Sequence, residues 1–298
     1  MKRFHQMRYT LLRRAVQLTV LLLFVGTARW GWTMASAPLL DGTLSASKFA
    51  GIIPLTDPLA TLERLAAGHL PTVTAGLGAL IVVMLYGLLG ARTFCGWICP
   101  MNMVTETASW VRTKLGLKAD VVRLSRHVRY GLLIAALLLS AATGTAAFEV
   151  VSPQAWLWRD LIFGTGLAAL SVASAIFSLD LALMKHGWCG HLCPLGAFWS
   201  LVGRLSPKPL VQIHFDDQAC TRCGDCLHVC PEPQVIRFVD LAKTGRIPSG
   251  DCINCGHCIA VCPDQALTFK GLGQPKKQSI NHQFNAQTNP DSGVNHHA

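Results

Sequence analysis

Long apolar stretches occupy much of the first 184 residues and are missing from the remainder of the chain. Four of them stand out, at about residues 15–34, 70–90, 130–147 and 161–184. Each is close to the ~20 residues that a helix needs to cross a bilayer. A helix is the expected conformation, because lipid offers no water to satisfy unpaired backbone groups. The pattern therefore predicts an α-helical membrane domain with four transmembrane helices over residues 15–184, preceded by a short tail at residues 1–14.

The chain changes character after residue 184, where proline, polar residues and cysteine replace the apolar runs. Residues 211–270 are predicted to form a compact α+β domain. Residues 271–298 are rich in Asn, Gln and Ser and poor in apolar residues, which predicts a disordered tail.

Composition supports a membrane protein, since only 14% of the residues are charged and the mean hydropathy is +0.38. Soluble domains carry about 25% charged residues. The net charge of +10 would suggest nucleic acid as the partner of a soluble protein. Here the cytoplasmic loops of a membrane protein explain it better, because they collect Lys and Arg. We therefore expect the membrane, and no nucleic acid, as a partner.

The basic residues are distributed unevenly among the connecting segments. Those before the first helix and between the second and third are Lys2, Arg3, Arg8, Arg13, Arg14, Arg92, Arg112, Lys114, Lys118, Arg123, Arg126 and Arg129. The other two loops contain only Arg29, Lys48, Arg64 and Arg159. This asymmetry predicts a multi-pass protein of a bacterial inner membrane, with both termini and the C-terminal domain in the cytoplasm. The first apolar segment could instead be a cleaved signal peptide, but cleavage would leave that domain on the same side.

Eight of the twelve cysteines form two runs with the spacing C-x2-C-x2-C-x3-C-P, at residues 220–231 and 252–263. This is the spacing of bacterial ferredoxins that hold two [4Fe–4S] clusters. Three cysteines of a run surround one cluster, and the fourth, which we expect at the start of a short helix, reaches the other. A single C-x2-C pair could bind zinc, but two complete runs in tandem favour iron and sulfur.

Crosswise ligation assigns each cluster three cysteines of one run and the last cysteine of the other. The expected ligands of cluster 1 are Cys220, Cys223, Cys226 and Cys262. The expected ligands of cluster 2 are Cys252, Cys255, Cys258 and Cys230. Short β-hairpins around residues 213–215 and 266–269 are expected to complete the domain, which would transfer single electrons.

The remaining four cysteines lie in a repeated C-x3-C-P motif at residues 95–100 and 189–194. Residues four apart share one face of a helix, so the pairs Cys95–Cys99 and Cys189–Cys193 would each point one way. If the two motifs are related by symmetry, the four thiols could converge, either as ligands of a further cluster or as redox thiols near quinone. Packing as small apolar side chains would explain one such pair, but its repetition at an equivalent place favours a function.

Weaker candidates lie at the predicted membrane edges. His69, His186 and His191 could accept a proton from quinol, although an interfacial histidine without such a role is the simpler interpretation. Asp180 and Glu106 could do the same, or could be solvated carboxylates. The chain has no C-x-x-C-H motif for covalent haem and no dinucleotide-binding glycine pattern.

Four apolar segments, two C-x3-C-P motifs and a tandem eight-cysteine domain, in this order, resemble the NapH family over residues 3–270. NapH is the ferredoxin-type membrane component of the periplasmic nitrate reductase system and is grouped with MauN of methylamine utilisation. The resemblance implies quinol oxidation, with electrons passing to a ferredoxin-like partner, a c-type cytochrome and then nitrate reductase. It carries the twelve cysteines over in the roles given above.

The predicted topology leaves the electron path open, because the clusters are expected in the cytoplasm and the final acceptor outside. The leading hypothesis is an electron-transfer subunit with quinol dehydrogenase activity. A redox-dependent maturation factor and a redox sensor for a respiratory metalloenzyme are the alternatives.

Overall fold

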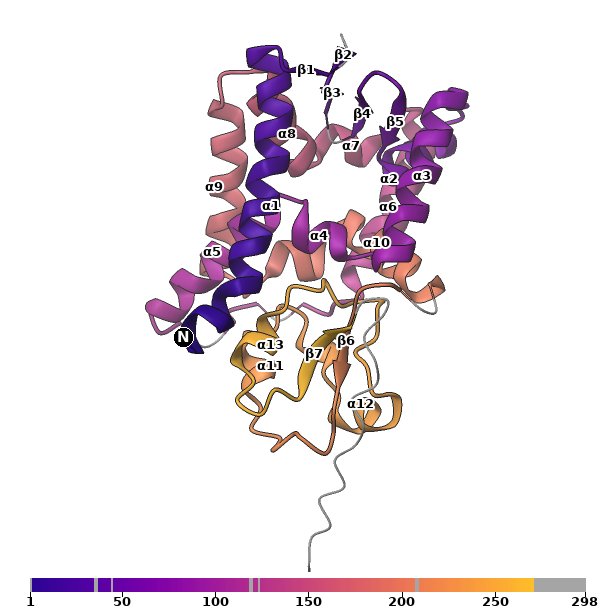
Figure 1. Cartoon of the computed structure of the whole chain (residues 1–298). Coiled ribbons are helices and arrows are strands. Elements are labelled where there is room, and N and C mark those ends of the chain that lie inside the picture. The colour runs from indigo at the N-terminus through magenta and orange to yellow at the C-terminus, as the bar shows by residue number, and fades with distance from the viewer. Residues whose placement is uncertain are drawn as a thin grey trace, which may run out of the picture.

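All four predicted apolar segments contain a helix in the computed structural model, which describes residues 2–34, 37–43, 45–117, 120–122, 124–206 and 209–270. These helices are α1 (Lys2–Trp30), α3 (Val73–Leu89), α6 (Val128–Thr143) and α9 (Leu167–Ala182). Figure 1 shows them upright in one helical part, with a smaller α+β domain below. The predicted disordered tail, residues 271–298, lies outside the described residues.

Only one helix in the described ranges, over Arg8–Trp30 within α1, is long and apolar enough to cross a membrane by length and composition. The other three helices have 17, 16 and 16 residues. At 1.5 Å per residue they are about 25 Å long, slightly short of the ~30 Å hydrocarbon core. The chain is mostly helical, as predicted, and four membrane crossings stay a prediction.

The largest differences from the predicted helix boundaries concern the first and the fourth apolar segment. Helix α1 begins at Lys2 instead of following a tail of 14 residues. Its early turns pack on the α+β domain, where the ring of Tyr9 lies 5.0 Å from that of Phe269. The predicted segment 161–184 is also divided, because α8 (Pro153–Phe163) ends within it and α9 starts after Gly166, whose φ of +88° suits glycine.

Segments predicted as loops fold into a cap at the end of the helical part that is remote from the α+β domain (Figure 1). The cap comprises β1 (Thr33–Met34), β2 (Ala37–Pro38), β3 (Leu40–Gly42), β4 (Ala46–Phe49), β5 (Ile53–Thr56), α2 (Pro58–Ala66), α7 (Ala147–Val151) and α8. Strands β3, β4 and β5 form an antiparallel sheet. Buried Glu63 on α2 accepts hydrogen bonds from the N–H groups of Phe148 (2.8 Å) and Glu149 (3.1 Å), which fixes α2 to α7.

The helical part contains a structural repeat. In the first copy, α3 is followed by α4 (Thr93–Trp97) and α5 (Met101–Lys114). In the second, α9 is followed by a π-helical turn (Trp188–Leu192) and α10 (Pro194–Leu205). Helix α5 packs against α9, and α10 contacts α3, so the second helix of each copy lies against the first helix of the other. This exchange brings the two short turns, each with a cysteine pair, together at the end of the helical part that faces the α+β domain.

The α+β domain contains β6 (Gln212–Phe215), α11 (Asp225–Val229), a 3-10 turn (Pro233–Val235), α12 (Phe238–Thr244), α13 (His257–Val261) and β7 (Leu267–Lys270). Strands β6 and β7 pair in antiparallel register, with Gln212 opposite Lys270. Helices α11 and α13 lie side by side.

The fourth cysteine of each run was expected at the start of a helix, and this was wrong. Cys230 follows the last residue of α11, and Cys262 follows the last residue of α13. The helices start directly after Gly224 and Gly256, whose positive φ angles a side chain would disfavour. The proline after each fourth cysteine prevents the helix from continuing.

The helical part meets the α+β domain closely at α4. A Cβ atom added at Gly96 would lie against the backbone carbonyl oxygen of Ile253, whereas one added at Gly76 would meet no atom within 4 Å. We therefore expect Gly96→Ala to lower stability by ~1–3 kcal/mol, because the backbone must shift. Thermal unfolding in detergent would measure this. The control Gly76→Ala should keep or raise the midpoint, and equal midpoints for the two variants would contradict the contact.

Candidate functional site

Two small cavities in the α+β domain are each lined by four cysteines. Those around the first are Cys220, Cys223, Cys226 and Cys262. Those around the second are Cys230, Cys252, Cys255 and Cys258. Because α11 and α13 lie side by side, the last cysteine of each run reaches the cavity of the other. The structure thus gathers the cysteines in the same two sets that the sequence predicts.

The chemistry of these thiols suits a metal cluster. Burial, reinforced by neighbouring Cys255, raises the pKa of Cys252 to about 12. Burial also raises the pKa of Cys258 well above its usual value. Such thiols become good thiolate ligands only next to a strong positive charge, which bound iron supplies. Backbone N–H groups also point at sulfur, since Arg222 donates to Cys220 Sγ and Asn254 to Cys252 Sγ, both at 3.4 Å.

The four cysteines of the C-x3-C-P motifs converge on a third cavity, at the centre of the structural repeat. The lining thiols are Cys95, Cys99, Cys189 and Cys193. Its volume is about 30 Å³, against about 20 and 10 Å³ for the two ferredoxin cavities. The hydroxyl of Thr105 lies 3.7 Å from Cys189 Sγ. Within the described ranges no group of three or more His, Cys, Asp or Glu could hold a single metal ion.

A buried charge network joins this site to the α+β domain. The carboxylate of Glu232, which is 3% exposed, accepts hydrogen bonds from Arg92 (2.7 Å), Arg129 (3.1 Å) and Arg126. Arg92 also donates to the carbonyl oxygens of Asp251 (2.8 Å) and Cys189 (3.4 Å). Burial alone would raise the pKa of Glu232, but the three guanidinium groups outweigh it and hold that pKa below its usual range.

Helix α1 also forms hydrogen bonds to the segments that contain the C-x3-C-P thiols and the second ferredoxin cavity. Gln17 donates to the carbonyl oxygens of Gly96 (3.2 Å) and Cys99 (3.5 Å). Arg13, fully buried, donates to Glu106 at 2.5 Å and to the carbonyl oxygen of Cys255 at 3.5 Å. The C-x3-C-P thiols and the second ferredoxin cavity are therefore held by one set of hydrogen bonds.

The weaker candidates fall in different places. His69 is near the cap, where its ring lies 3.0 Å from the carbonyl oxygen of Gly144, remote from the cysteines. His186 lines the four-thiol cavity. Asp180, expected in solvent, is fully buried and accepts a hydrogen bond from the N–H of Trp188 (3.0 Å). Glu106, also interpreted as solvated, is instead paired with Arg13 and Arg14.

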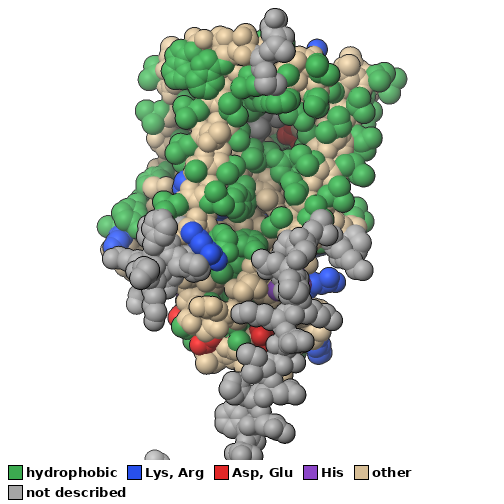
Figure 2. All heavy atoms as spheres, in the orientation of Figure 1, with side chains coloured by type: hydrophobic (Ala, Val, Ile, Leu, Met, Phe, Trp, Pro, Cys, Tyr) green, Lys and Arg blue, Asp and Glu red, His purple; other side chains and the backbone are tan. Residues whose placement is uncertain are grey.

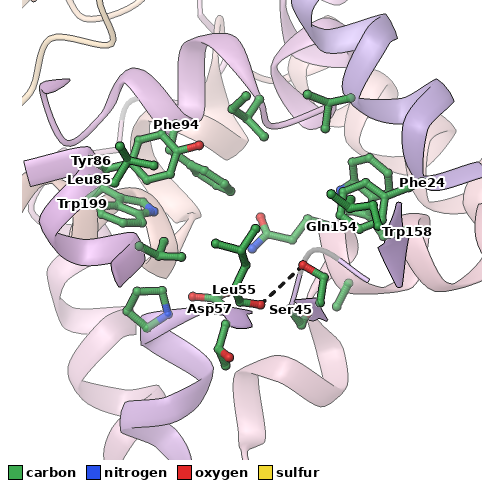
Figure 3. Close-up of a pocket in the computed structure, with 18 of the residues that line it drawn as sticks. Phe24, Ser45, Leu55, Asp57, Leu85, Tyr86, Phe94, Gln154, Trp158 and Trp199 are labelled. Atoms are coloured by element: carbon green, nitrogen blue, oxygen red, sulfur yellow. Dashed lines mark hydrogen bonds between the residues drawn. The ribbon is translucent and has the colours of Figure 1, made fainter. Parts of the chain in front are cut away.

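Two further cavities were not found by sequence reasoning. One is a cleft of about 580 Å³ between α1, α5 and the α+β domain, with basic groups from Arg14, Lys185 and His257 on its walls. The other is an apolar cavity of about 210 Å³ in the helical part, lined by α1, α3, α4, α8 and the cap (Figure 3). Both depend on tertiary contacts between remote segments, for which the sequence has no local signal.

Comparison with known proteins agrees with this geometry. A family model described as a 4Fe-4S dicluster domain matches residues 212–263, and one described as a 4Fe-4S binding domain matches twice, at residues 72–118 and 165–211. The second model therefore covers each C-x3-C-P motif. The chain is 43% identical to the ferredoxin-type protein NapH of Escherichia coli (strain K12) over 231 residues, 77% of each chain.

The chain belongs to the NapH/MauN family of ferredoxin-type proteins. It is 43% identical to NapH of Haemophilus influenzae over 232 residues, 77% of each chain. It is 44% identical to the methylamine utilization ferredoxin-type protein MauN of Methylorubrum extorquens over 226 residues, 76% of this chain and 75% of that one. No solved structure matches at a comparable significance. Family membership makes this chain an iron–sulfur electron-transfer protein.

The buried network around Glu232 predicts that a single conservative substitution there lowers the free energy of unfolding strongly. Glu232→Gln should lower stability by about 3 kcal/mol, because it leaves buried arginines without a carboxylate. The thermal midpoint, followed by cluster absorbance, would report this. Asp217→Asn removes the exposed partner of Arg222 and should cost no more than ~1 kcal/mol. Similar losses for both variants would contradict the importance of the buried network.

Proposed function

We propose that this protein is a quinol dehydrogenase component, which takes electrons from membrane quinol and passes them through a line of iron–sulfur sites. The observation that carries the proposal is the contiguity of the cysteine sites. The four-thiol cavity and the second ferredoxin cavity share Pro231, Glu232 and Ile253 as a common wall. The two ferredoxin cavities in turn share Ile236.

Each ferredoxin cavity is proposed to hold one [4Fe–4S] cluster, ligated by the four cysteines that line it. Bound there, such a cluster would accept and release single electrons. The grouping of the cysteines and the N–H groups aimed at sulfur support this assignment.

The four thiols at the membrane edge are proposed to hold a third [4Fe–4S] cluster. Their cavity is at least as large as each ferredoxin cavity, and they come from both copies of the repeat. The 4Fe-4S binding family model that matches each copy supports the same assignment. The alternative, redox chemistry of the thiols themselves, differs in iron content.

The membrane arrangement is part of the proposal. Helices α1, α3, α6 and α9 would cross a bacterial inner membrane, with the α+β domain in the cytoplasm and the cap outside. Exposed apolar side chains along these helices support this, among them Leu80 and Met84 on α3 and Leu138 on α6. Figure 2 shows the hydrophobic side chains gathered over the helical part and charged ones near the α+β domain.

The final acceptor is proposed to be a periplasmic nitrate reductase, reached through a ferredoxin-like partner and a c-type cytochrome. Methylamine utilisation is the alternative, because the identities to NapH and MauN are nearly equal. The neighbouring genes would separate the two.

Iron analysis tests the third cluster. Anaerobically purified protein should contain about twelve iron atoms per chain, four for each cubane. The double variant Cys95→Ser, Cys189→Ser should contain about eight, with the EPR signals of the ferredoxin clusters intact. Eight iron atoms in both proteins would favour redox thiols and contradict a cluster at the membrane edge.

Electron entry is tested by adding a reduced quinol analogue to the anaerobic protein in detergent. Cluster absorbance and EPR should show rapid reduction in the wild type and at least ~100-fold slower reduction in the Cys95→Ser, Cys189→Ser variant. Dithionite should reduce the ferredoxin clusters of both proteins. Intact clusters that dithionite reduces and quinol does not would favour a maturation or sensing role.

A further inference from the structure

The apolar cavity in the helical part lies directly beside the four thiols. It shares Phe94 and Gln154 with the four-thiol cavity, so a single layer of side chains separates the two. Aromatic rings form much of its wall: Phe24 and Trp158 pack together at 4.9 Å on one side. Tyr86, Phe94 and Trp199 form a cluster on the other side, with ring centroids 5.4–5.7 Å apart (Figure 3).

Gln154 places a polar amide at this site. Its side chain is 8% exposed, and its amide points into the cavity (Figure 3). It makes no hydrogen bond to another described residue. Its amide is open to the cavity, so a ligand that can donate and accept hydrogen bonds could reach it there. The buried indole N–H groups of Trp158 and Trp199, whose rings line the cavity, also lack a partner among the described residues.

Asp57 places a carboxylate on the cap side of the cavity (Figure 3). One carboxylate oxygen accepts a hydrogen bond from the N–H of Leu59 at 2.9 Å and so caps α2. Burial is the main reason why the pKa of Asp57 is raised to about 7. The charges of Glu149 and Glu63 also raise this pKa, whereas hydrogen bonds from backbone N–H groups lower it. Asp57 belongs to the cap and not to a proposed membrane-spanning helix. A carboxyl group that titrates near neutrality can accept a proton from a substrate hydroxyl.

Size and access also suit a ring from the membrane. A cavity of about 150 Å³ is enough to bind a benzene ring, and this one has about 210 Å³. Figure 2 shows a hollow in the hydrophobic flank of the helical part, with an acidic side chain visible inside it. A lipid-soluble molecule could therefore enter sideways without passing through water.

We propose that this cavity binds the ring of a quinol, with Gln154 hydrogen-bonded to a ring oxygen near the thiols and Asp57 accepting the hydroxyl protons. The inference rests on the proposed function and identifies its substrate site. Oxidation of one quinol breaks two O–H bonds and releases two electrons and two protons. The two electrons reduce two of the oxidised iron–sulfur clusters, one each. Asp57 takes the protons one at a time and releases them on the cap side, opposite the ferredoxin domain.

The basic cleft between α1, α5 and the α+β domain is the competing location. It is larger, but Arg14, Lys185 and Glu106 give it a charged wall, and it lies at the level of the ferredoxin domain. An apolar ring with a long hydrocarbon tail fits the aromatic cavity better, because its transfer from lipid then exposes little apolar surface to water.

Two substitutions separate binding from chemistry. Asp57→Asn keeps an oxygen that can cap α2 but removes the proton acceptor, and Asn is a good capping residue. We expect quinone binding to change less than ~3-fold and cluster reduction by quinol to slow about 100-fold. Leu55→Trp fills the cavity, in which Leu55 lies (Figure 3), and should weaken quinone binding about tenfold or more.

Each substitution has a control elsewhere in residues 40–57 that leaves the cavity unchanged. Asp41→Asn alters an exposed carboxylate on β3, and Ile52→Trp adds a ring at a position that is 83% exposed. Both controls should bind quinone and react with quinol as the wild type does. All variants should keep the wild-type iron content and their reduction by dithionite.

Binding is measured separately from turnover, by photo-crosslinking with an azido derivative of a short-chain ubiquinone and of a naphthoquinone. We expect labels within residues 20–24, 82–86 or 154–158, and their loss in Leu55→Trp.

Labels in residues 107–113, 185–186 or 257 would place the quinone in the basic cleft and overturn the proposal. Labelling of the cavity in a wild type that quinol does not reduce would refute the dehydrogenase function and leave a quinone site. Rapid reduction of the clusters of Leu55→Trp by quinol would refute quinol binding in this cavity, but it would not refute the dehydrogenase function.

Discussion

The arrangement of the whole molecule depends on one buried carboxylate. Glu232 follows the last cysteine of the first ferredoxin run by two residues and accepts hydrogen bonds from Arg92, Arg126 and Arg129 of the helical part. A buried carboxylate with three guanidinium partners cannot be withdrawn without leaving charges unpaired in a poorly solvated place. The interaction therefore fixes the distance between the C-x3-C-P thiols and the second ferredoxin cavity, and it links the two parts of the chain.

The internal repeat explains why four cysteines from distant parts of the chain meet. Each copy ends its first helix in a short turn with two thiols, and the packing of α5 on α9 and of α10 against α3 turns the copies toward each other. From the apolar cavity to the first ferredoxin cavity, each site shares at least one wall residue with the next. In the proposed function this line takes electrons from quinol at membrane depth to the surface of the ferredoxin domain, while protons leave on the cap side.

Sequence reasoning predicted the parts of this line that local spacing encodes. The grouping of the eight ferredoxin cysteines and the helices at the four apolar segments follow from spacing and hydropathy. The role of Arg92, Arg126 and Arg129 could not be predicted, because basic residues in a loop between two predicted membrane helices are explained equally well by topology. The apolar cavity was missed because its walls come from strands of three or four residues, too short for a recognisable pattern, and from helices far apart in the chain.

The most direct test of the central claim, a single line of redox sites that starts at the membrane-edge thiols, is rapid freeze-quench EPR after mixing the oxidised protein with substoichiometric quinol. We expect a signal that is absent from the Cys95→Ser, Cys189→Ser variant to form first. The signals of the ferredoxin clusters should follow and broaden, since neighbouring reduced clusters couple magnetically. Reduction of the ferredoxin clusters at the same rate in that variant would contradict the claim, because electrons would then bypass the membrane-edge site.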